Sequence, residues 1–221
     1  MKQQPQLFDA SVILSEDTWV WPGDIPFRRE LTSRLERTKN GVPTGANASA
    51  YSLSAHLGTH VDAPLHVGEG TLDTRQLPLE VLIGPCQVVS GPWGHVITAA
   101  ELCALPVDLA EVRRLILHTG AGDRAREAGH FAQDYPVMDP GAAELLAASG
   151  VQLVGLDAPS VDAMESESLP THHVLARRGV IMLEGLCLAG IPDGTYELIA
   201  LPLAIHGGDG SPVRAVLRAT T

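Results

Sequence analysis

Short apolar runs and stretches that alternate apolar with polar residues dominate the chain, and a period of two is typical of β-strands. Residues 50–56 alternate cleanly, so that Tyr51, Leu53 and Ala55 would share one face of a strand and His56 would end it on the polar face. The pattern predicts strands over Leu7–Leu14, Ser49–His56, Cys86–Ser90, Arg113–His118, Val151–Asp157, Val180–Glu184, Tyr196–Pro202 and Val213–Arg218.

Helical signals are few. The clearest helix covers Gly141–Ser149, where Asp139 can cap the first turn, Pro140 suits that turn and Gly150 ends it. Further helices are predicted over Pro170–Arg178 and near Thr98–Leu105.

Strands and helices alternate between residues 113 and 184, which is typical of crossover units in a parallel or mixed sheet. The last two strands are joined by a turn-rich segment at 206–212 and are expected to pair antiparallel. The chain shows no internal repeat and no linker-like segment. We therefore expect one α/β domain over residues 1–221, with a mixed sheet and flanking helices.

Composition removes several classes of function. The 221 residues hold 15 Lys+Arg and 26 Asp+Glu, and the formal net charge of −11 offers no attraction to nucleic acid or to an anionic membrane. No apolar run approaches the roughly 20 residues of a spanning helix, and the first residues lack the apolar region of a secretory signal. Three widely spaced cysteines predict neither a disulfide framework nor a thiolate zinc site. A cytoplasmic location is expected.

One basic segment stands apart from this acidic background. Arg28–Lys39 holds five of the 15 Lys+Arg, but Glu30 and Glu36 interrupt it and no aromatic residue lies within it. It is interpreted as a solvated surface segment.

Candidate chemistry is concentrated in residues 56–66, where His56, His60, Asp62 and His66 lie within eleven positions. In a straight strand His56 and His60 would be about 13 Å apart, too far for two ligands that each lie ~2.1 Å from one metal. Glycine and β-branched residues disfavour a helix here. The remaining solution is a tight loop after the strand, with Gly58 supplying an unusual backbone angle, that brings His60 and Asp62 back beside His56.

A second group of candidate ligands lies far along the chain. His172 and His173 open the second predicted helix, and only one of the two can point inward because adjacent helical residues diverge. Glu184 ends an apolar strand, where an unpaired buried carboxylate would be costly and a metal would neutralise it. Imidazole and carboxylate ligands without thiolate fit zinc, manganese or iron.

The pattern His-x-Gly-Thr-His-x-Asp-x-Pro-x-His at 56–66 resembles the signature of the metal-dependent cyclase-like hydrolases, and the resemblance extends over nearly the whole chain. Further similar segments are 19–24 (WVWPGD), 84–86 (GPC), 155–160 (GLDAPS), 183–186 (LEGL), 196–203 (YELIALPL) and 211–218 (SPVRAVLR). Within the family, the terminal segments most resemble the bacterial kynurenine formamidases.

The resemblance implies a cyclase-like β/α/β fold and a homodimer that binds two divalent ions per subunit, zinc or alternatively manganese. His56, His60 and Asp62 would hold one ion, and Asp62 would bridge to a second held by His172 and Glu184. His66 would donate and accept protons, and Trp21 would line the pocket for a small aryl formamide. The implied reaction is hydrolysis of N-formyl-L-kynurenine to L-kynurenine and formate by a metal-activated hydroxide.

Asp157 ends its strand and has two interpretations. It could orient a ligand histidine, or it could be an ordinary residue of the turn that follows the strand.

Three alternatives to the formamidase remain open on the sequence alone. A sister hydrolase of the same fold would act on isatin or another cyclic or aryl amide. A non-haem iron oxygenase is suggested by His60-x-Asp62 with a distant histidine, and it would require dioxygen. A non-catalytic metal-binding module would have a closed ligand shell and no role for His66.

Overall fold

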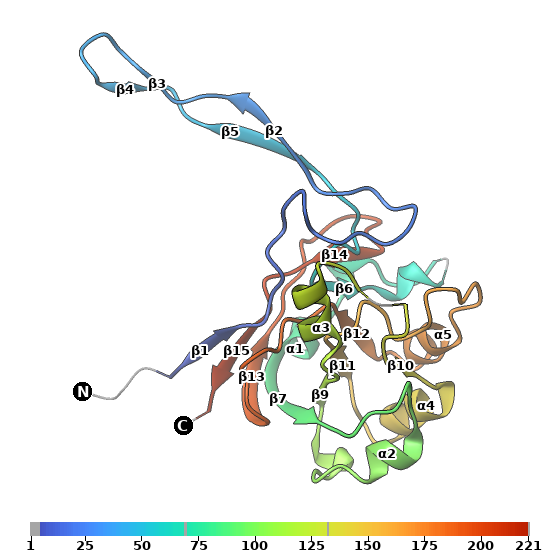
Figure 1. Ribbon diagram of the computed structural model, residues 1–221. Helices are drawn as coiled ribbons and strands as arrows, with labels where there is room; N and C mark the ends of the chain where they lie inside the picture. Colours follow the sequence, from blue (N-terminus) through green and yellow to red (C-terminus); the bar gives the residue numbers. More distant parts are fainter. Residues whose placement is uncertain (1–4, 69, 132, 221) are drawn as a thin grey trace.

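The computed structural model describes residues 5–68, 70–131 and 133–220. Its centre is a strongly curled sheet with the strand order β1-β15-β13-β7-β9-β11-β12-β6-β14 (Figure 1). Neighbouring strands from β7 to β12 run parallel, and the outer pairs on both sides run antiparallel. The predicted α/β class with a mixed sheet is therefore confirmed.

The sheet and its short companions comprise β1 (Leu7–Asp9), β2 (Arg28–Ser33), β3 (Glu36–Arg37), β4 (Pro43–Thr44), β5 (Ala48–Ser52), β6 (His60–Asp62), β7 (Ile83–Ser90), β8 (Val96–Ile97), β9 (Arg114–His118), β10 (Val137–Met138), β11 (Leu153–Leu156), β12 (Ile181–Glu184), β13 (Gly194–Ile199), β14 (Gly210–Pro212) and β15 (Val216–Ala219). The helices are α1 (Leu79–Leu82), α2 (Ala99–Cys103), α3 (Ala121–Ala128), α4 (Pro140–Ala148) and α5 (Pro170–Arg177), with single 3₁₀ turns at Pro64–His66, Thr74–Gln76 and Leu109–Glu111.

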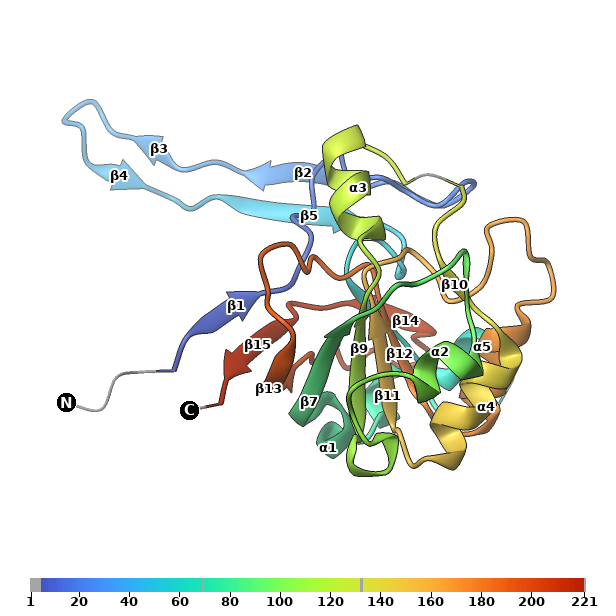
Figure 2. The same cartoon turned by 60° about the horizontal axis from the view of Figure 1, so that its bottom comes forward.

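Two apolar clusters lie on opposite faces of the sheet. One is enclosed by α2, α4 and α5, which lie together on one side (Figure 2). The other lies inside the curl of the sheet, between α1 and the antiparallel strands β13 and β15. The central strands β11 and β12 are buried along their whole length, as expected for parallel strands covered on both faces.

The helix boundaries follow the predicted signals. The Asp139 carboxylate accepts hydrogen bonds from the backbone N–H groups of Gly141 and Ala142, and Pro140 occupies the first turn of α4. Pro170 likewise opens α5. The predicted antiparallel pairing of the last two long strands is found between β13 and β15.

Several predicted strands are shorter than the pattern indicated: Tyr196–Pro202 ends at Ile199, and Val213–Arg218 begins at Val216. Two more of these differences lie in the N-terminal part of the chain, in Leu7–Leu14 and Ser49–His56. The first ends at Asp9 and not at Leu14, and the second ends at Ser52, so that His56 lies in a turn and does not end a strand. The alternation at 50–56 does not mark one buried face, because Tyr51 is 62% exposed. Periodicity describes side-chain direction, but burial requires a covering layer, and none covers β5 among the described residues.

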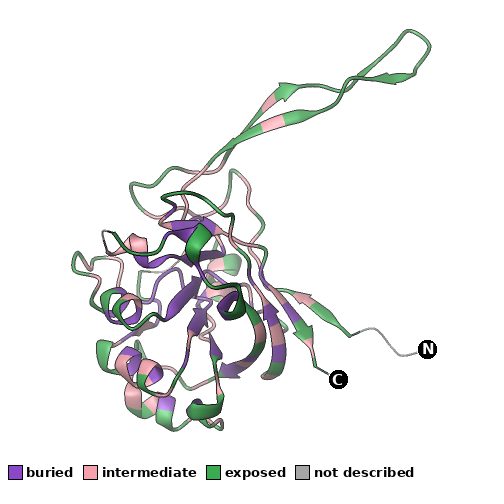
Figure 3. Ribbon diagram, turned by 180° about the vertical axis from the view of Figure 1, so that it is seen from behind, coloured by how far each residue is buried: buried purple, intermediate pink, exposed green. Residues whose placement is uncertain are grey.

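Residues 28–52 form a projecting hairpin, which we call the arm. Strand β2 pairs with β5, and β3 pairs with β4 nearer the tip. The arm extends away from the rest of the molecule in both views (Figures 1 and 2), and its residues are exposed except for Leu31 and Ser49, which are half-buried (Figure 3). The basic segment Arg28–Lys39 thus lies in solvent, as predicted.

Candidate metal centre

A turn and a sheet register together position the first three candidate ligands. The chain turns at residues 55–59, where Gly58 has a φ of +69°, and then enters β6. His60 and Asp62 are therefore residues of a short strand and not of a returning loop, which corrects the prediction for these two. The antiparallel pairing of β6 with β12 places His60 directly opposite Glu184.

The turn is held against the end of β12 by close packing. The Thr59 hydroxyl donates to the carbonyl of Gly185 at 2.6 Å and accepts from the backbone N–H of Val12. A Cβ on Gly185 would collide with the backbone carbonyl of Gly58, and the φ of Gly185 is +64°. Any side chain at Gly185 would therefore push the turn away from Glu184.

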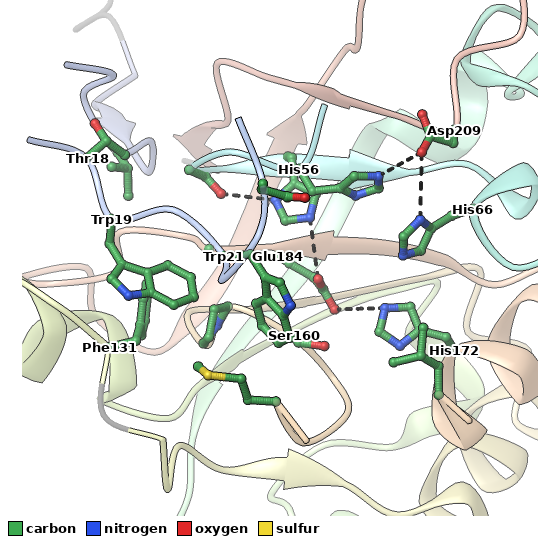
Figure 4. Close-up of a pocket in the computed structure, with 18 of the residues that line it drawn as sticks. Thr18, Trp19, Trp21, His56, His66, Phe131, Ser160, His172, Glu184 and Asp209 are labelled. Atoms are coloured by element: carbon green, nitrogen blue, oxygen red, sulfur yellow. Dashed lines mark hydrogen bonds and ion pairs between the residues drawn. The ribbon is translucent and has the colours of Figure 1, made fainter. Parts of the chain in front are cut away.

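Asp62 lies at the centre of the cluster. Its Oδ1 is 2.8 Å from His56 Nδ1 and 3.4 Å from His60 Nε2, and its Oδ2 is 3.5 Å from His172 Nε2. Glu184 approaches from the other side, with Oε2 3.4 Å from His60 Nε2 and Oε1 3.7 Å from His172 Nε2 (Figure 4). The five predicted metal ligands therefore meet in one place.

Asp162 supports His172 from behind and was not predicted. Its Oδ2 lies 2.7 Å from His172 Nδ1 and also accepts the backbone N–H of His172, while its Oδ1 accepts the backbone N–H of Thr171. All three residues are buried. This contact leaves Nε2 of His172 facing Asp62 and Glu184, which is the arrangement in which a carboxylate orients a metal-binding imidazole.

His66 and Asp209 lie at the outer side of the cluster, and Asp209 was also not predicted. The Asp209 Oδ2 lies 3.2 Å from His56 Nε2 and 3.9 Å from His66 Nδ1 (Figure 4). The rings of His56 and His66 have centroids 4.1 Å apart. Asp209 precedes β14, whose pairing with β6 brings this part of the chain beside the histidines.

The electrostatics of the cluster favour bound positive charge. Burial alone would lower the histidine pKa values, but Asp62, Glu184, Asp162 and Asp209 outweigh it and raise the pKa of His56 to about 9 and those of His60 and His172 to about 10. The same histidines lower the pKa of Asp62 well below its usual value against the effect of burial. Burial lowers the pKa of His66.

A single carboxylate oxygen gives the most direct evidence that the cluster fits a cation. Asp62 Oδ2 is buried and has no hydrogen-bond partner in the described part of the chain, although an unsatisfied carboxylate oxygen is costly. Ligand atoms of His60, Asp62 and Glu184 lie within 4.8 Å of one another, as do those of His56, Asp62 and His66. A divalent ion would supply the charge and the bond that Asp62 lacks, so the donor set fits a metal.

The remaining candidates have simpler roles. Asp157 accepts hydrogen bonds from the backbone and hydroxyl of Thr119 and from the backbone of Gly122, so it is the residue of a turn after β11 and does not orient a ligand histidine. His173 is exposed whereas His172 is buried in the cluster, in agreement with the divergence expected of adjacent helical residues.

A pocket of about 430 Å³ opens directly above the cluster. Its floor includes His56, His60, His172 and Glu184. One wall is aromatic: Trp19 contacts both Trp21 and Phe131 edge to face, with centroid distances of 5.9 and 5.2 Å (Figure 4). Trp21 therefore lines this pocket, together with Trp19 and Phe131.

The buried contact between Asp162 and His172 leads to a prediction. Replacing Asp162 by asparagine should weaken metal binding by about 10–100-fold, because the imidazole loses the carboxylate that fixes its orientation and raises its basicity. Isothermal titration of the metal-free protein with zinc would measure the change. The exposed Asp17→Asn variant is the matched control, and equal affinities of the two variants would show that Asp162 does not act through His172.

Comparison with known proteins identifies the family. Residues 8–163 match the family described as "Putative cyclase". The chain belongs to this family. A relative described as kynurenine formamidase, from Salinibacter ruber, is 42% identical over 212 residues, covering 96% of this chain and 97% of the relative.

Solved structures show the same fold. A protein described as a "Potential Metal-Dependent Hydrolase With Cyclase Activity" has a TM-score of 0.81 at 27% identity, with 98% of each chain covered. An isatin hydrolase bound to the product analogue thioisatinate has a TM-score of 0.80 at 24% identity, covering 99% of this chain and 94% of that one. The cyclase-like fold that the sequence resemblance implied is confirmed. Among the described residues, each helix is too short or too polar to cross a membrane.

Proposed function

We propose that the protein hydrolyses N-formyl-L-kynurenine to L-kynurenine and formate. The observation that carries this proposal is the 42% identity to a kynurenine formamidase over almost the full length of both chains. The site supports it, because a cluster of imidazoles and carboxylates lies at the floor of a pocket with an aromatic wall. An aryl formamide offers a ring for that wall and a carbonyl for the floor.

We further propose that the cluster holds two divalent ions, zinc or alternatively manganese. His56, His60 and Asp62 would bind one, and Asp62, His172 and Glu184 would bind the other. Support comes from the central position of Asp62, which reaches three histidines through its two oxygens. The ions would supply Lewis-acid polarisation of the formyl carbonyl and would lower the pKa of the attacking water.

His66 is proposed as the proton donor and acceptor. It lines the pocket and is part of a group with His56 and Asp62, and its side chain is more exposed than those of His60 and His172. An imidazole there can take a proton from the attacking water and give one to the departing aniline nitrogen. Asp209, close to its Nδ1, would hold the ring in place for both transfers.

The aromatic wall of the pocket is proposed to bind the aryl ring of the substrate. Trp21 and its neighbours Trp19 and Phe131 would pack against the aryl ring and so hold the formyl group over the ions.

Replacing Trp21 by alanine should raise KM for N-formyl-L-kynurenine by about tenfold or more, since the variant loses the buried area of the indole and an aromatic contact worth about 0.5–1.5 kcal/mol beyond that area. The metal content should not change, because Trp21 belongs to neither of the proposed ligand sets. Steady-state kinetics with elemental analysis measures both quantities. The exposed Tyr51→Ala variant, in the arm, serves as the control, and an unchanged KM in Trp21→Ala would remove this residue from the binding site.

A second candidate is hydrolysis of isatin or another cyclic amide, favoured by the shared fold with an isatin hydrolase. Turnover of N-formyl-L-kynurenine and isatin, measured side by side on one preparation, separates the two. We expect the formamide to have the higher kcat/KM, and a preference for isatin would overturn the assignment of substrate. The open pocket above the cluster argues against a non-catalytic module with a closed ligand shell.

A further inference from the structure

The turn that carries Trp21 also carries an acidic residue of the pocket. The backbone N–H of Asp24 donates to the carbonyl of Trp21 at 3.0 Å, which closes a four-residue turn. Pro22 and Gly23, with a φ of +93° at the glycine, are residues that a type II turn favours at its two central positions. Trp21 and Asp24 both line the pocket. One turn of the chain therefore presents an aromatic ring and a carboxylate to the same cavity.

A single hydroxyl fixes Asp24 relative to the metal cluster. The Ser54 Oγ donates to Oδ2 of Asp24 at 2.8 Å and accepts from the backbone N–H of His56 at 3.2 Å. The backbone N–H of Ser54 donates in turn to the carbonyl of Ile25 at 2.9 Å. Asp24 is exposed, but these contacts hold its carboxylate at a set place beside a proposed metal ligand, as a positioned binding group requires.

Asp24 differs from the other carboxylates that line the pocket. Glu184 and Asp209 both face histidines of the cluster. In the described part of the chain Asp24 has no cationic partner, and its hydrogen bond from Ser54 uses only Oδ2. Asp24 therefore offers an unpaired negative charge, with Oδ1 available as an acceptor, at the solvent-facing part of the pocket.

The pocket offers no equivalent group for a negative charge. Among the described residues that line it, none is a lysine or an arginine. The imidazoles of the floor are proposed ligands of the ions or, for His66, the proton shuttle. N-formyl-L-kynurenine carries an ammonium and a carboxylate on one carbon, at the end of a short chain attached to its ring. The lining residues are suited to the first of these groups and not to the second.

We propose that Asp24 is a specificity-determining residue that binds the α-ammonium of the substrate, while the α-carboxylate remains in solvent. With the ring against Trp21 and the formyl group at the cluster, the ammonium would donate to Oδ1 of Asp24. The substrate class is then an aryl formamide with a cationic amine close to its ring, and it includes amines that have no carboxylate. This inference rests on the proposed hydrolysis of N-formyl-L-kynurenine.

The experiment measures kcat/KM of the zinc-loaded protein for three formamides. The first is N-formyl-L-kynurenine, the second has hydrogen in place of its α-carboxylate, and the third has hydrogen in place of its α-ammonium. Loss of the carboxylate should lower kcat/KM by less than about fivefold, the most that an exposed ion pair contributes. Loss of the ammonium should lower it by about tenfold or more, through KM, because a hydrogen bond between charged groups is lost.

The Asp24→Asn variant identifies the carboxylate that binds the ammonium. Asparagine keeps the shape of the side chain and an oxygen that can accept from Ser54, so the turn should be preserved. The variant should lose about tenfold in kcat/KM for the two formamides that carry an ammonium, and it should equal the wild-type protein for the third. Asp17→Asn, at an exposed position outside the pocket, is the matched control and should leave all three values unchanged.

Three results would overturn the inference. A loss as large on removing the carboxylate as on removing the ammonium would show that the pocket recognises both groups. An equal loss in Asp24→Asn for all three formamides would give Asp24 a structural role only. Unchanged kinetics of this variant would remove Asp24 from the binding site. Failure of the zinc-loaded wild-type protein to hydrolyse any of the three would instead refute the proposed function, on which the inference rests.

Discussion

Replacing His66 by alanine is expected to lower kcat for N-formyl-L-kynurenine by about 10²–10⁴-fold, the range that a positioned acid–base residue contributes. The metal content should remain that of the wild-type protein, because the proposed ligand sets do not include His66. Stopped-assay kinetics and elemental analysis of the same sample measure the two quantities. The exposed His173→Ala variant is the control, since it removes an imidazole that no part of the site uses.

The structure gives this experiment a second possible outcome. Ligand atoms of His66 lie within 4.8 Å of those of His56 and Asp62, which is close enough for all three to share an ion. A His66→Ala variant that loses metal together with activity would make His66 a ligand and not a proton shuttle. Full activity would exclude both roles.

The Asp62→Asn substitution is expected to have the largest effect on metal binding. Asparagine keeps the shape of the buried side chain but removes the charge that His56, His60 and His172 face. Both proposed ions use Asp62, so the variant should lose most of its metal and with it nearly all hydrolysis. Elemental analysis after dialysis gives the number of ions per chain, and Asp17→Asn provides the control at an exposed position.

The number of ions retained by Asp62→Asn also distinguishes one centre from two. Loss of both ions supports a bridging carboxylate. Loss of one would assign Asp62 to a single centre, and an unchanged number would remove it from the ligand set altogether.

Much of the site was predictable because its residues are held in a short, recognisable motif. The spacing of His56, His60 and Asp62 required a turn at Gly58, and the structure has that turn. The strand β6 that follows was not predictable, since three residues carry too little periodicity to show that they pair with β12 and β14. The register of that pairing, which sets Glu184 opposite His60, depends on contacts between residues 124 positions apart.

The two carboxylates that support the histidines, Asp162 and Asp209, could not be recognised in the sequence for a different reason. Asp162 and Asp209 look like ordinary acidic residues in turn-rich segments, and only the folded chain shows that one holds His172 and the other lies between His56 and His66. A signal for Asp162 was available in its closeness to the segment 155–160, which the family resemblance included. Asp157, the acid within that segment, had instead a structural role in the turn after β11.

The arm was not predicted as a unit, and the reason is physical. Its strand β5 alternates in the way a half-buried strand does, and alternation alone does not reveal whether a second layer exists. The basic content of residues 28–39 correctly indicated solvent exposure, and the exposure of the paired strand β5 follows from its position in the same hairpin.

Turnover of N-formyl-L-kynurenine by metal-free and zinc-loaded forms of one preparation tests the central claim most directly. The claim is that the cluster around Asp62 is a metal centre that hydrolyses this formamide. The account predicts negligible formate release from the metal-free protein and activity that rises with bound zinc up to two ions per chain. Undiminished hydrolysis by protein shown to contain no metal, or no hydrolysis by protein that holds two ions, would contradict it.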